Sequence, residues 1–407
     1  MVHTKDRSVR ATMRDAFRRS PGPPKRHARH LAAAGRWAAV GATALLVTAC
    51  SSLSTTGRDD SSPSPSSSAA PSADKPPPTS ARPLAPMPPE VAARLDTAIT
   101  AILSTSRIPG ATIGVWAPQG TYLKGFGVAD RQSGRPMDPA TLMRIGSETK
   151  TFTVTALLRL VDQGKFSLDD PIGRFIPDVP GGDAITIRHL AGMRSGLPTY
   201  LSNPSFARKF LADPTRQYSA QELLDYAFAQ PPLFPPGTAF NYSNTNTILL
   251  GRLIEHLSGQ SLATYLQANV LGPLKLGATS YPVDTALPSP HAHGYTTQTA
   301  DGQEVDATGW NPSIAGAAGA MISNGVDLGV WAKALVDGDL LAPATRAQRL
   351  QFVPELPDNP EIAYGLGLYR NHGWTGHDGG IPGYQSLTLY LPEAQTALVI
   401  LLIPTSR

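Results

Sequence analysis

A long stretch of small and polar residues divides this chain into two unequal parts. Residues 51–90 contain eleven Ser and ten Pro among 40 residues and almost no large apolar side chain. Such a segment cannot bury enough apolar surface to offset the entropy that is lost when it is ordered. We therefore expect residues 50–90 to be a disordered tether and residues 91–407 to be one domain with a large core.

The segment ahead of this tether is strongly basic. Residues 1–49 hold ten Lys or Arg and two Asp, a net charge of +8, which leaves −4 on the rest of a chain whose total is +4. A mildly acidic domain does not attract phosphates, so the composition excludes a nucleic-acid partner. The uncharged stretch 37–49 is shorter than the roughly 20 residues of a membrane-spanning helix, and this pattern is typical of a signal peptide.

The one cysteine of the chain directly follows that stretch. Val47-Thr48-Ala49-Cys50 resembles a bacterial lipobox, in which small residues precede a cysteine that is lipidated. The resemblance implies that residues 1–49 are a lipoprotein-type signal peptide and that Cys50 anchors the exported protein to the outer face of the bacterial cytoplasmic membrane. An ordinary cleavage site with a chance cysteine, or an uncleaved anchor, is the alternative. A single cysteine also excludes a disulfide framework and a thiolate zinc cluster.

Apolar periodicity predicts an α+β fold for the remaining chain. Apolar side chains at every fourth position of 89–106 predict a helix behind an N-terminal proline. Strands are expected at both ends of the domain and helices in its middle, which indicates an antiparallel sheet flanked by helices with a mostly helical insert. The expected strands are 111–116, 122–128, 365–369, 386–391 and 396–403, and the expected middle helices are 220–230, 245–258 and 262–270.

A serine and a lysine stand one turn apart at the start of a helix that is apolar nearly all round. The segment 147–163 begins Ser147-Glu148-Thr149-Lys150, and such a helix is buried rather than amphipathic. The spacing brings the Ser147 hydroxyl and the Lys150 amine within hydrogen-bonding reach, beside the free N–H groups of a helix N-terminus. Ser147 is thus a candidate nucleophile and Lys150 its base. The alternative is a serine that caps the helix and a solvated lysine.

Two further short motifs contain polar residues or glycines that are typical of active sites. Tyr242 and Asn244 stand two residues apart ahead of a helix, where they can project to one side as a proton-relaying phenol and an amide. The alternative is that Ser243 or Asn244 caps that helix and that Tyr242 is half buried. Gly376-His377-Asp378-Gly379-Gly380 allows the backbone to approach a ligand closely, as an edge strand beside a cleft would, although alone it could be a turn.

Together, the three motifs resemble the active-site elements of serine β-lactamases and penicillin-binding proteins, in particular the branch of class C β-lactamases and D-alanyl-D-alanine carboxypeptidases. The order Ser-x-x-Lys, Tyr-Ser-Asn, His-x-Gly, at separations of about 95 and 135 residues, carries the resemblance. It covers essentially all of residues 91–407 and implies a β-lactamase/transpeptidase-like fold. Further matching segments are 166–171, 187–190, 195–197, 249–251, 317–321 and 364–368.

The resemblance implies a role for each motif residue. Ser147 would be acylated, Lys150 and Tyr242 would share the proton transfers, and water would then hydrolyse the acyl-enzyme without a metal or organic cofactor. The backbone N–H groups of Ser147 and Gly380 would form the oxyanion hole. The residues that would contact substrate are Asn244, which would orient an acylamide, His377, which would help Tyr242 or bind a carboxylate, Gly379 and Gly380.

The chain also departs from this family's pattern. The aromatic residue common just before the Ala/Gly-rich segment appears here as Ile314, so Trp310, four residues earlier, is the candidate for lining the cleft. Asp378 replaces a small or uncharged residue, which favours esters over anionic substrates. Relatives usually continue into a C-terminal helix after the strand that ends at Ile403, so either the sequence is truncated or helix 89–106 covers the sheet face unaided. His291 and His293 form an H-x-H that we interpret as a loop rather than a metal pair, because no carboxylate or cysteine stands beside it in the sequence.

Three hypotheses follow from the sequence. The first is a cell-envelope serine hydrolase that acts on D-Ala-D-Ala peptides of peptidoglycan. The second has the same mechanism but cleaves small esters or β-lactams. The third is a non-catalytic envelope binding protein of the same fold, against which the presence of Ser147, Lys150 and Tyr242 counts.

Overall fold

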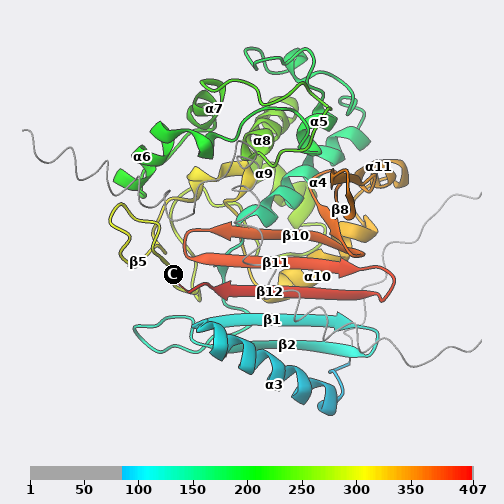
Figure 1. Ribbon diagram of the computed structural model, residues 1–407. Helices are drawn as coiled ribbons and strands as arrows, with labels where there is room; N and C mark the ends of the chain where they lie inside the picture. Colours follow the sequence, from blue (N-terminus) through cyan, green and yellow to red (C-terminus); the bar gives the residue numbers. More distant parts are fainter. Residues whose placement is uncertain (1–84, 406–407) are drawn as a thin grey trace, which may run out of the picture. The chain divides into compact units, whose positions relative to one another are not determined.

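A single antiparallel sheet of eight strands forms the framework of the described part of the chain (Figure 1). The computed structural model describes residues 85–405, so the predictions for residues 1–49, for Cys50 and for most of the tether lie outside it. The strand order is β2-β1-β12-β11-β10-β9-β8-β7, which confirms the α+β prediction. These strands are β1 Gly110–Ala117, β2 Gly120–Gly127, β7 Val353–Leu356, β8 Asn359–Tyr364, β9 Tyr369–Asn371, β10 Trp374–Ile381, β11 Tyr384–Leu391 and β12 Thr396–Ile403.

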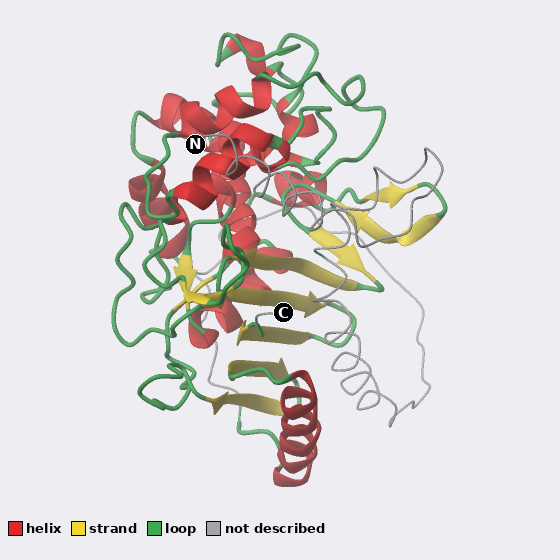
Figure 2. Cartoon of the chain, turned by 60° about the vertical axis from the view of Figure 1, so that its left-hand side comes forward, coloured by secondary structure: helices red, strands yellow, loops and turns green. Residues whose placement is uncertain are grey.

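Most of the helices gather beyond β10, in the insert between the first and last strands of the sheet (Figures 1 and 2). This arrangement confirms a helical insert. Two short strand pairs, β3 (Met143–Arg144) with β6 (Ile322–Ser323) and β4 (Tyr295–Thr296) with β5 (Val305–Asp306), connect its loops. The helices are α3 Pro89–Ser106, α4 Thr149–Asp162, α5 Ile187–Ala191, α6 Pro204–Ala212, α7 Ala220–Phe228, α8 Asn244–Ser258, α9 Leu262–Leu266, α10 Gly325–Asp337 and α11 Pro343–Arg349.

Helix α3 lies against the β1–β2 hairpin. It has the bounds that the four-residue periodicity predicts, and it buries Leu95 and Ile99. Asp96 accepts a hydrogen bond of 2.7 Å from the Tyr122 hydroxyl of β2. Ahead of the helix, the backbone of Thr121 donates to the Ala85 carbonyl and accepts from Met87 N–H. The packed part of the chain therefore begins before residue 91, where the sequence suggested its boundary.

Helix α4 runs through the centre of the molecule and is buried on nearly every side. Eleven of its fourteen residues are buried, as its apolar composition predicts. Phe152 stacks on Trp331 of α10 with ring centroids 4.0 Å apart, so α4 and α10 form one layer on the sheet. The hydroxyl of Thr153 donates to the Ala317 carbonyl at 2.7 Å, which satisfies a buried polar group at a distant loop. The start of α4 is thereby fixed relative to both the sheet and the insert.

The C-terminal half contains the one element that the sequence misplaced. Residues 365–369 were expected to be a strand, but the Gly365 N–H donates to the Leu368 carbonyl across a turn, and β9 begins only at Tyr369. Gly367 adopts a left-handed φ of 71°, and a Cβ there would lie 2.5 Å from Val154. The prediction was wrong because a run of apolar residues and glycines does not reveal that α4 packs against this turn.

Candidate active site

Ser147 lies on a tight turn at the head of α4. Residues Gly146–Glu148 form a single 3₁₀ turn, η1, and α4 begins at the next residue. Gly146 supplies the left-handed φ of 51° that starts the turn. Ser147 is partly exposed, and its side chain caps neither η1 nor α4. The alternative interpretation of Ser147 as a helix cap is therefore wrong.

Lys150 turns its amine back toward Ser147 inside the protein. Its side chain is 0% exposed, so the alternative of a solvated lysine is also wrong. The Nζ atom donates to the Ser147 Oγ at 2.9 Å and to the Ala318 carbonyl at 2.8 Å. Ala318 belongs to η6 (Gly316–Ala318), and this second contact holds the amine in place. A proton can pass directly between Oγ and Nζ over this 2.9 Å contact.

Tyr242 lies beside the Lys150 amine. The Lys150 Nζ lies 4.8 Å from the centroid of the Tyr242 ring, and the His377 ring lies 5.9 Å from it. Asn244 is the first residue of α8, and neither it nor Ser243 caps that helix with a side chain. The Asn244 Oδ1 is buried without a hydrogen-bond partner among the described residues. Three segments far apart in sequence thus meet around the Lys150 amine.

The glycines of β10 let that strand touch the nucleophile turn. The segment 376–380 is part of β10 rather than a turn. A Cβ on Gly379 would lie 1.9 Å from the Ile145 carbonyl oxygen, and a Cβ on Gly146 would lie 2.6 Å from the Gly380 nitrogen. No residue with a side chain fits either position. The backbones of Ser147 and Gly380 consequently lie beside one another, as an oxyanion hole requires.

His377 is held by the protein on both ring nitrogens. Its side chain is 1% exposed; Nδ1 donates to the Asp378 carbonyl, and the Tyr364 hydroxyl lies 3.2 Å from Nε2. Since His377 and Gly379 both face η1, Asp378 between them lies on the other face of β10. Its carboxylate is 3.7 Å from the His377 Nδ1, and its charge also raises the pKa of Glu148.

Three other side chains of interest have structural partners outside this group. Trp310 is half-buried and packs edge-to-face on Phe210 of α6, with centroids 5.5 Å apart. The Ile314 carbonyl accepts the Tyr200 hydroxyl at 2.7 Å. The Arg370 guanidinium lies 4.8 Å above the Phe352 ring. The indole of Trp310 therefore contributes to packing between α6 and the loop ahead of η5 (Pro312–Ile314).

Sequence reasoning missed one residue of this site, Glu148. It is 1% exposed, and burial raises its pKa to about 8, against the effect of a hydrogen bond from Thr388 that lowers it. A charged residue directly ahead of an apolar helix was the available signal. Its pairing with β11, 240 residues away, is not visible in a local pattern.

Glu148 should make the stability of the fold depend on pH. Because its pKa in the folded chain, about 8, lies above the 4.5 of a free side chain, the folded state keeps a proton that the unfolded state has released between these values. Stability is thus fully retained below about pH 4.5 and falls as the pH rises to about 8. We expect Glu148→Gln to gain about 1.4 kcal/mol per pH unit over the wild type in this window.

Urea unfolding at about pH 5 and about pH 7 tests this expectation, since the difference in unfolding free energy between variant and wild type should grow by about 2–3 kcal/mol. A difference that stays the same at both pH values would show that Glu148 does not titrate there.

The H-x-H segment has a partner that its sequence neighbourhood did not reveal. The Nδ1 of His293 lies 2.7 Å from Asp306 Oδ2, and the His291 and His293 rings stack 5.5 Å apart. Among residues 85–405, however, no three His, Cys, Asp or Glu side chains cluster as a metal site would require. Within the same range, no helix combines the length and apolar character needed to cross a bilayer.

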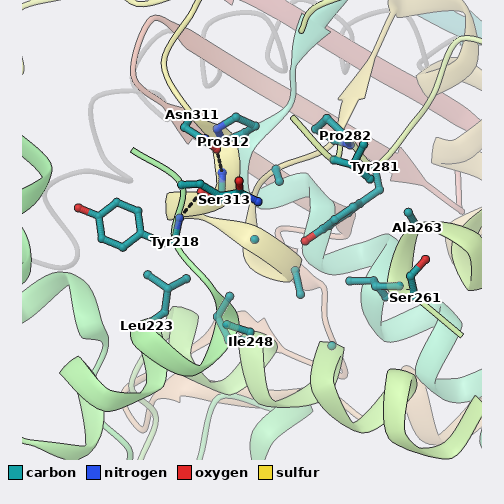
Figure 3. A pocket seen from close by; sticks show the side chains of 18 of the residues that line it. Tyr218, Leu223, Ile248, Ser261, Ala263, Tyr281, Pro282, Asn311, Pro312 and Ser313 are labelled. Atoms are coloured by element: carbon teal, nitrogen blue, oxygen red, sulfur yellow. Dashed lines mark hydrogen bonds between the residues drawn. The ribbon is translucent and has the colours of Figure 1, made fainter. Parts of the chain in front are cut away.

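A cavity of about 310 Å³ lies apart from the Ser147 group (Figure 3). Tyr218, Leu223, Ile248 and Tyr281 are among its walls, and it borders η5 and η6. Neither Ser147, Lys150, Tyr242 nor His377 lines it. This cavity therefore lies on the other side of the segment whose Ala318 carbonyl holds Lys150.

Comparison with known proteins agrees with this geometry. A family model described as Beta-lactamase matches residues 95–402, which is more than half of the chain. The chain belongs to the beta-lactamase family. The sheet flanked by helices is the β-lactamase/transpeptidase-like fold of that family, as the motifs predicted.

The relatives that this chain resembles carry different names. The chain is 28% identical over 322 residues to Protein flp of Staphylococcus aureus (strain MRSA252), covering 76% of this chain and 62% of that protein. It is 34% identical over 197 residues to Esterase EstB of Burkholderia gladioli, covering 45% of this chain and 50% of the esterase. The chain thus spans half to three fifths of these relatives.

A solved structure matches over a larger share of its own length. It is a D-stereospecific amidohydrolase from Streptomyces sp., with a TM-score of 0.68, 32% identity, and coverage of 74% of this chain and 91% of that one. Two of these relatives are named as an esterase and as an amidohydrolase, which supports hydrolase activity for this chain.

Proposed function

We propose that this chain is a serine hydrolase that forms an acyl-enzyme at Ser147. The observation that carries the proposal is the fully buried Lys150 amine, 2.9 Å from the Ser147 hydroxyl. An ammonium in such a place is costly to desolvate, so a neutral amine that accepts the serine proton is favoured.

The geometry supports the following sequence of steps. Lys150 takes the Oγ proton while the Ala318 carbonyl keeps the amine aligned, and Oγ attacks the substrate carbonyl carbon. The negative charge on the carbonyl oxygen is stabilised by backbone N–H groups of Ser147 and Gly380. Tyr242, beside the amine, passes the proton to the leaving group. Water then hydrolyses the acyl-enzyme by the reverse set of transfers.

The leading substrate class in this proposal is a peptide that ends in D-alanyl-D-alanine. The branch that the motifs resemble acts on such peptides, and Asn244, two residues from Tyr242 at the start of α8, would orient the substrate's acylamide. Export and lipid anchoring at Cys50 would place the enzyme beside peptidoglycan. Export and lipid anchoring are inferred from the sequence of residues 1–50 alone.

A second candidate is a hydrolase of uncharged D-amino acid amides or esters. Two observations favour it over a carboxypeptidase. Arg370 is stacked on Phe352, and both nitrogens of His377 are engaged, so neither side chain is offered openly to a substrate carboxylate. The similarity to a D-stereospecific amidohydrolase and to an esterase points in the same direction. A β-lactamase would use the same residues.

Covalent labelling separates catalysis from binding. A fluorescent penicillin or fluorophosphonate should label the wild type and Ser205→Ala, an exposed serine, but not Ser147→Ala. The absence of label on the wild type, or equal label on Ser147→Ala, would leave only the non-catalytic binding protein. Hydrolysis rates on diacyl-L-Lys-D-Ala-D-Ala, D-alaninamide, p-nitrophenyl acetate and nitrocefin then divide the substrate classes.

A further inference from the structure

Glu148 connects η1, the turn that carries Ser147, to the sheet through a hydrogen bond. It follows Ser147 on η1, and its side chain points away from solvent toward β11. The Thr388 hydroxyl of β11 donates to Glu148 Oε2 at 2.6 Å. The other carboxyl oxygen, Oε1, is buried without a hydrogen-bond partner. A group in this setting is accommodated more readily as a neutral acid than as a carboxylate.

A second hydrogen bond to the sheet lies on the other side of Ser147. The Ser386 hydroxyl, two residues from Thr388 and on the same face of β11, donates to the Ile145 carbonyl at 2.8 Å. The hydroxyls of Thr388 and Ser386 thus hold the chain by hydrogen bonds on both sides of Ser147. Because Gly379 leaves no room between β10 and Ile145, the turn has little freedom to shift.

Several ionisable groups surround Glu148. From β10 come Asp378 and His377, the latter directly opposite Thr388 in the strand register. From α4 comes Lys150, whose amine points to Ser147 and Ala318. From α11 comes Arg349, which donates to the Thr151 carbonyl one turn into α4. Burial raises the pKa of Glu148, the hydrogen bond from Thr388 lowers it, and the charge of Asp378 raises it again.

We propose that Glu148 is a positioning residue that holds the Ser147 turn as a neutral carboxylic acid, and that its ionisation at alkaline pH lowers the rate of acylation. The inference rests on the proposed acylation at Ser147. An ionised Glu148 would place a negative charge one residue from the site where the substrate oxyanion develops, in surroundings that screen charge poorly. The same charge would also weaken the packing of the turn against β11, which accommodates Glu148 as a neutral acid.

The decisive measurement compares Glu148→Gln with the wild type across pH. The amide keeps the size of the side chain and an acceptor for Thr388 but cannot ionise. We expect the ratio of variant to wild-type fluorophosphonate labelling rates to rise at least about threefold between about pH 7 and about pH 9. Titrations that both proteins share, such as those of Lys150 and Tyr242, cancel in this ratio. A constant ratio would overturn the inference.

Two further variants keep Glu148 and move its titration in opposite directions. Thr388→Val removes a bond that lowers the pKa of Glu148, so the alkaline loss of rate should move to higher pH. Asp378→Asn removes a charge that raises the pKa, so the loss should move to lower pH. A purely structural role would not produce opposite shifts, and shifts in the same direction would contradict the proposal. If the wild type is not labelled at any pH, the proposed function itself fails; labelling with a constant ratio refutes the role of Glu148 alone.

Discussion

Replacing Lys150 with methionine is expected to lower kcat/KM for acylation by about 10⁴-fold or more. Methionine has a similar length and no charge, so it suits a position that is 0% exposed and should leave α4 intact. What it removes is the group 2.9 Å from Ser147 Oγ that can accept the proton. The chemistry, and not the packing, should therefore account for the loss.

Rates of p-nitrophenyl acetate hydrolysis and of fluorophosphonate labelling check this expectation, with thermal unfolding to confirm the fold. Lys165→Met, at an exposed lysine just beyond α4, is the matched control and should retain wild-type rates. A Lys150→Met protein whose rates remain within about tenfold of the wild type would exclude Lys150 as the base.

Replacing Gly379 with alanine should damage both the fold and the site. The added Cβ would stand 1.9 Å from the Ile145 carbonyl oxygen and 2.4 Å from Ser386 Oγ, so β10 and η1 must separate. We expect a loss of unfolding free energy of about 2–4 kcal/mol from overpacking. Separation would also displace the Ser147 N–H from the Gly380 N–H, and misplacing one oxyanion-hole donor costs about 10²–10³ in kcat.

The neighbouring glycine provides the control for stability. A Cβ on Gly380 would meet no atom within 4 Å, so Gly380→Ala should melt within about 2 °C of the wild type while it keeps its backbone N–H. Chemical denaturation and initial rates measure the two effects separately. If Gly379→Ala were as stable and as active as the wild type, the close approach of β10 to the nucleophile turn would have no functional meaning.

Much of the fold and the site could be read from short segments. Residues 89–106 became a helix with the expected bounds, because its periodicity is a property of neighbouring positions. The spacing of Ser147 and Lys150 gave a contact of 2.9 Å, because one helical turn brings residues three apart onto one face. The family followed from the order of three motifs, each readable within ten residues.

Contacts between distant segments were decided only by the tertiary structure. Residues 365–368 form a turn because α4 packs there, and Asp378 faces away from η1 because β10 alternates its side chains. The pKa of Glu148 is raised because β11, 240 residues later, covers its side chain. Local patterns record which residues can share a face, whereas burial and charge depend on what the rest of the chain brings against that face.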